Sequence, residues 1–352
     1  MDVKAGRLAA VDWINRHARR DDGYLGAYFT GSTAGMDPDA ALPTGSDIDV
    51  AVVTSSGLPQ PKIGKVAHRD VLLDITHFPA KVFASAEDVL SHYHLAHGLR
   101  TDNFIEDTTG ELRALQKRVA RHFAERNWVI RRCADAREKS EAGWRGITAD
   151  APWHDQVTTW LFATGVMTHV LLVAALRNPT VRLRYVAVRS VLADYGHAEM
   201  YDALLDSVGC TSLSADRTAH HHRALATVFD QAAALGRTPF FFSSEITPLA
   251  RPIAIDSTQQ LIERGDHREV VFWIAATFAR CHKILATDAP EALRRLAPAF
   301  DEFLADLGIE STSDLTARAA TSAAFIPTVW ETAEAIMSAN PDIVGNVRSA
   351  SR

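Results

Sequence analysis

The chain has 352 residues, enough for two domains, and its 47% hydrophobic and 23% charged residues suit a globular protein with a sizeable core. A formal net charge of −6 does not favour a protein that tracks long nucleic acid, because such proteins usually present a basic face. Three widely spaced cysteines (Cys133, Cys210 and Cys281) predict reduced thiols in a cytoplasmic protein, and exclude a disulfide framework or a paired-cysteine zinc site.

The N-terminal residues carry charges throughout and contain no continuous apolar run, so we expect no signal peptide. The stretch most like a membrane span covers residues 156–176, which lack formal charges. It contains polar residues, including Gln156, Thr159 and His169, and we therefore expect a buried helix and no contact with a membrane.

The first quarter of the chain predicts a helix followed by a small mixed sheet. Apolar residues recur at near-helical spacing between Leu8 and Ile14. A loop of small residues begins at Thr30, after an apolar run of strand length. Strands are expected at 24–29, 47–53, 63–67 and 70–77, the last two forming a hairpin around His68 and Arg69.

Helical periodicity dominates from residue 85 onward, where Ser85 and Asp88 form a capping box with aspartate in place of the usual Glu or Gln. Further helices are expected at about 111–126, 130–144, 154–177, 180–194, 197–208, 215–235, 257–264, 267–286, 289–307 and 312–338. Glycine, proline and small residues gather at 146–152, the best domain boundary. The sequence therefore predicts an α+β protein, with a small mixed-sheet domain at 1–148 and an all-α helical domain at 149–352.

Two carboxylates begin the strand expected at 47–53. Side chains two apart on a strand point to one face, so Asp47 and Asp49 lie together while Ile48 and Val50 face the core. Two neighbouring carboxylates repel each other unless a cation lies between them. Mg²⁺ suits such a site, because it takes one or two carboxylates and completes its coordination with water and substrate phosphate.

A phosphate cradle and a third acid accompany this pair. Gly31 and Ser32 follow the first strand, where glycine lets a phosphate approach the backbone and serine adds a hydroxyl donor. Asp74 lies between Leu73 and Ile75 on a predicted strand, a costly position for an acid that is neither paired nor functional. From a neighbouring strand it reaches the same cation.

The pattern of Gly31-Ser32, a loop, Ser46-Asp47-Ile48-Asp49 and a later strand acid resembles the polymerase-β-type nucleotidyltransferase superfamily. With the helical remainder, it is similar to the antibiotic nucleotidyltransferases, including the streptomycin/spectinomycin and kanamycin enzymes. The motif-bearing part covers roughly residues 24–78. The third acid is Asp74 and not a glutamate, so its reach is shorter.

The resemblance implies the chemistry and the roles of these residues. Asp47 and Asp49 would bind Mg²⁺, two ions in all, and Gly31 and Ser32 would hold the phosphates of ATP or another NTP. Asp74 would be a metal ligand, the general base, or both. The implied reaction transfers AMP, or another nucleoside monophosphate, to a hydroxyl of a small molecule, such as an aminoglycoside-like antibiotic, and releases pyrophosphate.

Two alternatives remain open at the sequence level. The same chemistry acts on a protein or on a tRNA end in some enzymes, and a basic patch or a wide cleft would favour those acceptors. A catalytically inactive relative would bind nucleotide without turnover. The sequence does not decide the acceptor, the preferred NTP, the general base or the oligomeric state.

Other polar groups receive a structural interpretation or stay open. The three histidines at 220–222 point about 100° apart on a helix, so they do not converge on one ion, and a solvated face is expected. Glu106 and Asp107 are expected in a loop, where their charge suits the start of the next helix. Charged groups of the helical part that could face substrate are Arg182, Arg184, Arg189, Glu263, Asp266 and Glu269.

Overall fold

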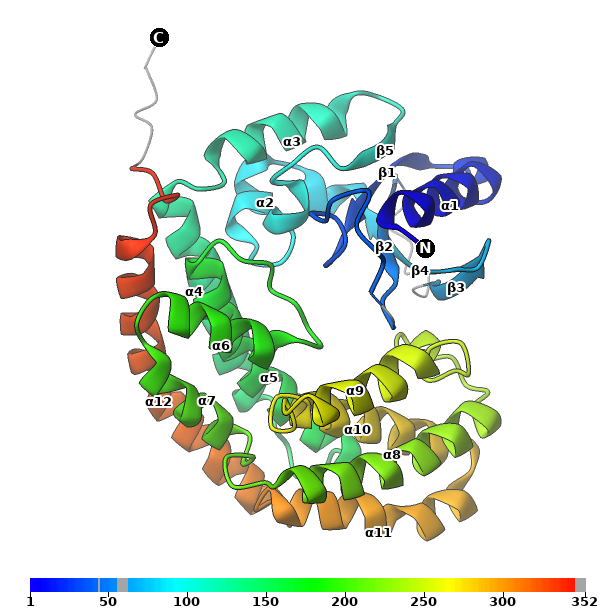
Figure 1. Cartoon of the computed structure of the whole chain (residues 1–352), viewed down its shortest axis with the longest axis vertical. Helices are drawn as coiled ribbons and strands as arrows, with labels where there is room; N and C mark the ends of the chain where they lie inside the picture. The colour runs from blue at the N-terminus through cyan, green and yellow to red at the C-terminus, as the bar shows by residue number, and fades with distance from the viewer. Residues whose placement is uncertain (44, 56–62, 346–352) are drawn as a thin grey trace. The chain divides into compact units, whose positions relative to one another are not determined.

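The computed structural model describes residues 1–43, 45–55 and 63–345 (Figure 1). The chain forms two compact units. The first contains Met1–Asp135, Leu176–Asn178 and the described residues from Asn340 onward, and the second contains Ala136–Ala175 and Pro179–Ala339. The expected α+β class is confirmed, because a mixed five-stranded sheet precedes a run of helices.

The first unit is built on a sheet with the strand order β3-β4-β2-β1-β5. The strands are β1 (Tyr24–Thr30), β2 (Ile48–Thr54), β3 (Gly64–His68), β4 (Val71–Pro79) and β5 (Phe104–Asp107). β2 and β4 pair in parallel, and the other three neighbouring pairs are antiparallel. The four strands expected from the sequence are confirmed.

Helix α1 (Val3–Arg16) covers one face of this sheet. Its Trp13 and Ile14 pack against Ile48, Val50 and Leu73, which point to that face because strand side chains alternate. Burial of each such aliphatic side chain contributes roughly 1.5–3 kcal/mol. Most of this face of the sheet is therefore a hydrophobic core.

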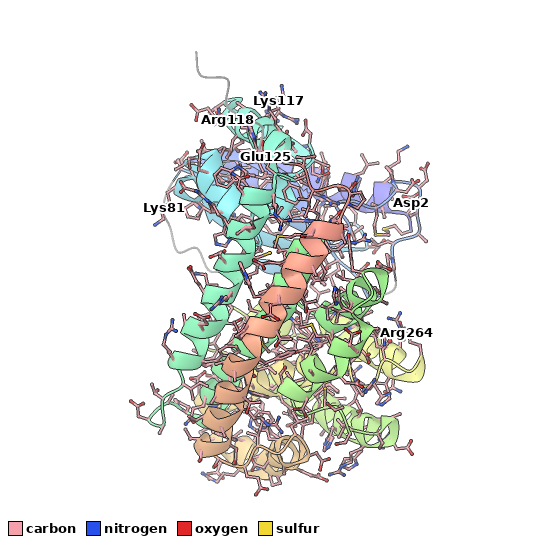
Figure 2. All side chains as sticks on the ribbon, turned by 90° about the vertical axis from the view of Figure 1, so that its left-hand side faces the viewer. Asp2, Lys81, Lys117, Arg118, Glu125 and Arg264 are labelled. Atoms are coloured by element: carbon pink, nitrogen blue, oxygen red, sulfur yellow. The ribbon has the colours of Figure 1, made fainter. Side chains whose placement is uncertain are left out.

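The opposite face is covered over only part of its length. Helices α2 (Ala86–Ser91) and α3 (Glu111–His122) pack their apolar sides against Tyr28, Ala51 and Val53 of the sheet. The other side of α3 is charged, and Lys117 and Arg118 point away from the sheet (Figure 2). On this face Asp49 of β2 and Asp47 just before the strand are polar, and they belong to the candidate site.

Two details of the first unit differ from the sequence expectation. The β3–β4 turn consists of Arg69 and Asp70, with φ of 49° and 62°, and His68 is still paired in β3. Glu106 and Asp107 do not lie in a loop, because they end the edge strand β5, which pairs with β1. A four-residue edge strand is too short to show alternation in sequence.

The second unit is helical. Its helices are the last part of α4 (Arg126–Arg145), α5 (Trp153–Ala174), α6 (Arg184–Asp194), α7 (Tyr201–Ser207), α8 (Ala215–Leu235), α9 (Ser257–Glu263), α10 (Val271–Asp288), α11 (Pro290–Asp306) and α12 (Thr312–Ala339). α5 packs against α6, α10 and α12, and α10 packs in turn against α8 and α11. These two apolar helices form the core of the unit. The expected boundary at 148/149 falls between α4 and α5, whereas the chain passes from one unit to the other inside α4.

Among the described residues, α5 is the one helix long and apolar enough to cross a membrane. The apolar window of α5 is 83% buried inside the protein, as in the core helix of a soluble protein. This burial agrees with the buried helix expected at 154–177.

Candidate functional site

Four polar side chains form a row across the sheet, each on a different strand. Thr30 of β1 pairs with Asp49 of β2, Asp49 with Asp74 of β4, and Asp74 with Lys65 of β3. Directly paired residues point to the same face of a sheet, so the register alone gathers these groups. Asp47 precedes Asp49 by two residues and adds its carboxylate on the same side.

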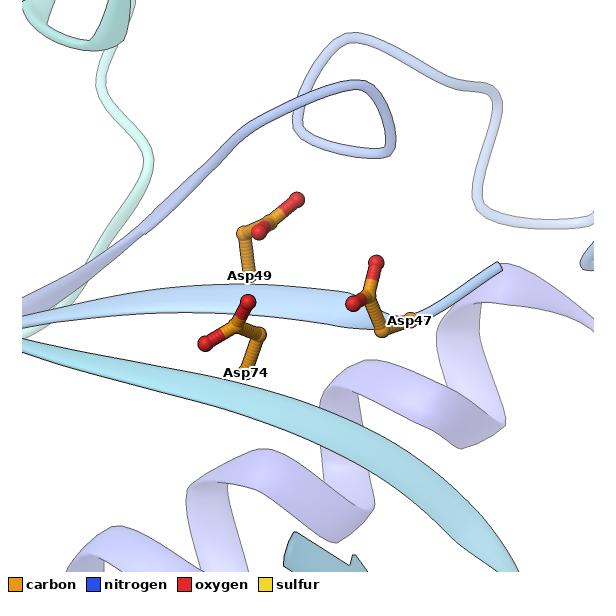
Figure 3. Close-up of side chains that lie close together, drawn as sticks. All are labelled: Asp47, Asp49 and Asp74. Atoms are coloured by element: carbon orange, nitrogen blue, oxygen red, sulfur yellow. The ribbon is translucent and has the colours of Figure 1, made fainter. Parts of the chain in front are cut away.

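The three aspartates converge as the sequence predicts. Ligand oxygens of Asp47, Asp49 and Asp74 all lie within 4.8 Å of one another. Figure 3 shows the three carboxylates close together, with Asp49 on β2, Asp74 on the neighbouring β4 and Asp47 just before β2. Such a set of hard oxygen donors matches the ligand preference of Mg²⁺, so the residues present fit the implied ion. Within the described parts of the chain, this is the one group of acidic, histidine or cysteine side chains with metal-binding geometry.

Lys65 is the member of the cluster that the sequence analysis missed. Its ammonium donates hydrogen bonds to Oδ2 of Asp47 at 2.5 Å and to Oδ2 of Asp74 at 3.1 Å. The lysine side chain is only 4% exposed, against 16% for Asp47 and 9% for Asp74. The signal was available in principle, since a β3–β4 hairpin with the observed turn places Lys65 directly opposite Asp74.

Gly31 lies directly against the acidic cluster. Its φ is +70°, and a Cβ added there would lie 1.8 Å from Oδ2 of Asp49. Only glycine tolerates both the left-handed backbone and this close approach. The neighbouring Ser32 is exposed. The structure thus brings Gly31 to the acids, as the sequence predicts, and leaves the Ser32 side chain accessible beside it.

The loop after Ser32 is fixed to helix α1. Arg7 donates through one Nη to the carbonyl oxygens of Thr33 and Ala34, both at 2.8 Å. Backbone N–H groups of Val3 and Lys4 bond the carbonyls of Ala40 and Pro38 farther along the loop. These contacts hold the start of the loop in place beside the cluster without using the cluster's own side chains.

A second arginine faces the same loop. Nη2 of Arg100 would lie 3.7 Å from a Cβ added at Gly35. Burial and the neighbouring Arg177 guanidinium lower the pKa of Arg100. The structure thus places the positive charge of Arg100 beside the glycine-containing loop. Nothing in the sequence points to Arg100, because the segment that carries it shows no motif.

Glu106 and Asp107, whose charge was expected to suit the start of a helix, have structural partners. Glu106 pairs with Arg19 at 3.1 Å. Asp107 accepts from the backbone N–H groups of Gly110 and Arg113, each at 2.9 Å, and so caps helix α3. The expectation that their charge serves the start of a helix is confirmed for Asp107.

Three of the six charged residues of the helical unit that were considered for substrate, Arg189, Asp266 and Glu269, form a network with one another. Arg189 bonds Asp266 and Glu269, each at 2.6 Å, and Tyr201 donates to Glu269 at 2.7 Å. The carboxylates of Asp266 and Glu269 are 8% and 1% exposed. A network of this kind ties α6 and α7 to the segment between α9 and α10, and its groups already have partners.

The three consecutive histidines do not form the expected solvated face. His221 and His222 are buried, bonding Asp306 at 2.7 Å and the carbonyl oxygen of Ile255 at 3.0 Å, while His220 is exposed. α8 is contacted by α9, α10 and α11, so more of its circumference is covered than the sequence indicates. Their separate partners agree with the prediction that the three rings do not share an ion.

Comparison with protein-family models gives no match for this chain, and comparison with curated proteins gives no matching relative.

Proposed function

We propose that this chain is a Mg²⁺-dependent nucleotidyltransferase of the polymerase-β type, which transfers a nucleoside monophosphate from ATP or another NTP to a hydroxyl of a small molecule. The observation that carries the proposal is the convergence of Asp47, Asp49 and Asp74 beside Gly31. A carboxylate triad next to a glycine turn is the combination that attack on an NTP α-phosphate requires.

In this proposal the aspartates hold Mg²⁺, which supplies charge neutralisation at the phosphates. Gly31 and Ser32 position the triphosphate, with close backbone approach at the glycine and a hydroxyl donor at the serine. Arg100 faces the same loop and contributes positive charge to the phosphates. Asp74 is a metal ligand, the base that takes the proton of the acceptor hydroxyl, or both. Nucleophilic attack of that hydroxyl on the α-phosphate releases pyrophosphate.

The acceptor in the proposal is a polar, cationic small molecule such as an aminoglycoside antibiotic, which would make the protein a resistance enzyme. The net charge of −6 suits a cationic acceptor and disfavours long nucleic acid. The three cysteines are buried and form no disulfide with one another, which fits a cytoplasmic location. Transfer to a protein or to a tRNA end is the other outcome that the same chemistry allows.

A second candidate function is a catalytically inactive nucleotide-binding protein. The observation that favours it is the Lys65 ammonium, which contacts two of the three acids where an active site needs a metal ion. Turnover distinguishes the two candidates directly.

The test is pyrophosphate release by the full chain with Mg²⁺ and each of the four NTPs, across a panel of aminoglycosides, tRNA and proteins. We expect release with at least one small-molecule acceptor, abolished by EDTA and by Asp49→Asn. Asp74→Asn separates the two roles of that acid: a base gives lost turnover with intact Mg²⁺–ATP binding, whereas a ligand gives loss of both. Nucleotide binding without turnover on every acceptor would favour the inactive candidate.

A further inference from the structure

The turn Ser32–Gly35, which follows β1, carries consecutive backbone N–H groups with no protein acceptor. Among the described residues, none of these four N–H groups donates a hydrogen bond. Exposed loop amides ordinarily bond water, so free N–H groups alone do not indicate a ligand. Two arginines beside the turn, Arg7 and Arg100, are what favours an anion here.

Arg7 of α1 fixes the direction of two of these N–H groups. Its Nη2 donates to the carbonyl oxygens of Thr33 and Ala34, both at 2.8 Å, so the two carbonyls point toward the same nitrogen. A trans peptide is planar and its N–H points away from its carbonyl. The N–H groups of Ala34 and Gly35 therefore point away from Arg7. The Met36 N–H bonds the Thr33 carbonyl at 3.2 Å and closes the turn.

Arg100 lies beside the same turn. A Cβ added at the exposed Gly35 would meet Nη2 of Arg100 at 3.7 Å and, among the described residues, no other atom within 4 Å apart from its chain neighbours. The guanidinium is half-buried and bonds no acceptor in the described parts of the chain, whereas Arg113 bonds the Asp102 carboxylate. A guanidinium that has lost part of its hydration gains from an acceptor. The space beside Gly35 would let a ligand provide one.

The segment that carries Arg100 lies next to the acidic cluster. A Cβ added at Gly98 would lie 3.1 Å from Oγ1 of Thr30, and Thr30 pairs with Asp49 in the sheet. Gly31, at the start of the turn, lies against the same aspartate. The free amides and the guanidinium are therefore neighbours of the residues that would hold the metal ion.

We propose that the turn Ser32–Gly35 and Arg100 bind the terminal phosphates of the NTP, and that Arg7 is a positioning residue that orients the turn for this purpose. Amide and guanidinium donors match the many acceptor oxygens of a phosphate chain, and the charged donor strengthens the hydrogen bonds. The inference rests on the proposed function, since the three aspartates and their ion would hold the α-phosphate of the same chain. It adds to that function the residues that recognise the rest of the triphosphate.

The experiment measures the binding of inorganic tripolyphosphate and of AMP to the full chain by calorimetry, with Mn²⁺ present. Arg100→Gln removes the guanidinium. Arg118→Gln is the matched control, because this exposed arginine of α3 points away from the sheet (Figure 2). We expect Arg100→Gln to weaken tripolyphosphate binding at least about tenfold, with AMP binding and the control unchanged. Unchanged tripolyphosphate binding in Arg100→Gln, or an equal loss for both ligands, would overturn the proposal.

Arg7 acts through the turn, so its test needs a measurement that lost stability alone would not change. Arg7→Ala removes the donor to the two carbonyls, and Arg7→Lys keeps one. We expect weaker tripolyphosphate binding in Arg7→Ala, at least partly restored in Arg7→Lys, while the affinity for Mn²⁺ alone stays that of the wild type. Equal tripolyphosphate affinity in Arg7→Ala and the wild type would overturn the positioning role. A matching loss of Mn²⁺ affinity would also overturn it, because the defect would then be a general loss of structure.

Asp49→Asn separates this inference from the function on which it rests. Mn²⁺ binding that is lost in Asp49→Asn, together with unchanged tripolyphosphate binding in Arg100→Gln, would overturn the inference alone. No Mn²⁺ binding by the wild type would overturn the proposed function, and with it the assignment of the anion as an NTP, whatever Arg100→Gln does to tripolyphosphate binding.

Discussion

At the end of β1, Gly31 turns the chain in the left-handed region beside the Asp49 carboxylate. A side chain at this position would meet both a backbone penalty and the acid itself. Gly110 offers a natural comparison, since its φ is +81° and an added Cβ would find nothing within 4 Å. The two glycines therefore separate the effect of conformation from the effect of contact.

We predict that Gly31→Ala costs clearly more stability than Gly110→Ala. The control should lose about 1–2 kcal/mol, the penalty of a left-handed residue with a Cβ, and keep its divalent-ion binding. Gly31→Ala should also displace the Asp49 carboxylate and weaken Mn²⁺ binding. Urea unfolding and Mn²⁺ titration of both variants are the measurements. If both variants lost the same free energy of unfolding, contact with the Asp49 carboxylate would make no contribution to the effect of Gly31→Ala.

The sequence predicts that Asp47, Asp49 and Asp74 belong to the site, because each of these inferences needs only the neighbouring residues in the chain. Alternation puts the first two on one face, and the cost of an acid between apolar residues identifies the third. Lys65 could not be found in the same way. A single lysine in a short edge strand is usually solvated, and its partner is decided by the hairpin register, which depends on two non-glycine residues with positive φ.

At the scale of elements, the junction between β5 and α3 replaces a loop that the sequence led us to expect. Asp107 ends the strand and caps the helix with both carboxylate oxygens. Most other helices and strands lie close to their expected positions, for instance α8 at Ala215–Leu235. The apolar periodicity of the longer helices extends over several turns. The four residues of β5 are too few to show the alternation that identifies a strand.

Asp107→Ala should destabilise the protein by about 1–2 kcal/mol, the usual cost of removing a helix cap. Divalent-ion binding should be unchanged, because Asp107 is engaged with the backbone of α3. Asp107→Asn keeps an acceptor oxygen for the N–H of Gly110, so its loss should be smaller. Chemical unfolding and pyrophosphate release are compared in the two variants. Lost turnover with unchanged stability would mean that Asp107 acts in catalysis and not as a cap.

At the scale of the whole molecule, the division of the chain is the feature least visible in sequence. Leu176–Asn178 and the described residues from Asn340 onward belong to the first unit although they lie far from it in the chain. Whether such distant segments belong to the first unit depends on tertiary contacts, which local composition does not encode. The glycine and proline residues at 146–152 mark a break between two helices, while the units separate inside α4.

His282 contributes to the loss of folding stability at acidic pH. The ring packs against Phe300 at a centroid distance of 4.5 Å, and its Nε2 is buried without a hydrogen-bond partner among the described residues. Burial, with a smaller effect of His154, lowers the pKa of His282 to about 4. The unfolded chain, with a pKa near 6.5, binds the proton more readily. The stability from neutral His282 is therefore complete above about pH 6.5 and is lost as the pH falls toward 4.

We predict that the free energy of unfolding depends less on pH in His282→Leu than in the wild type. Between pH 7 and pH 5 the wild type should lose up to about 2 kcal/mol more stability than the variant. Other buried histidines, including His221 and His222, titrate in both proteins and cancel in the comparison. Urea unfolding at several pH values gives the two curves. Parallel curves would contradict a neutral, buried His282.

The central claim is that the three aspartates bind an NTP through a divalent ion, and calorimetric titration with a non-hydrolysable ATP analogue tests it most directly. The wild type, Asp49→Asn and the exposed control Asp39→Asn are titrated with Mg²⁺ and with EDTA. The account predicts Mg²⁺-dependent binding in the wild type and the control, weakened at least about tenfold in Asp49→Asn. Binding that is equally tight in EDTA, or unchanged in Asp49→Asn, would contradict it.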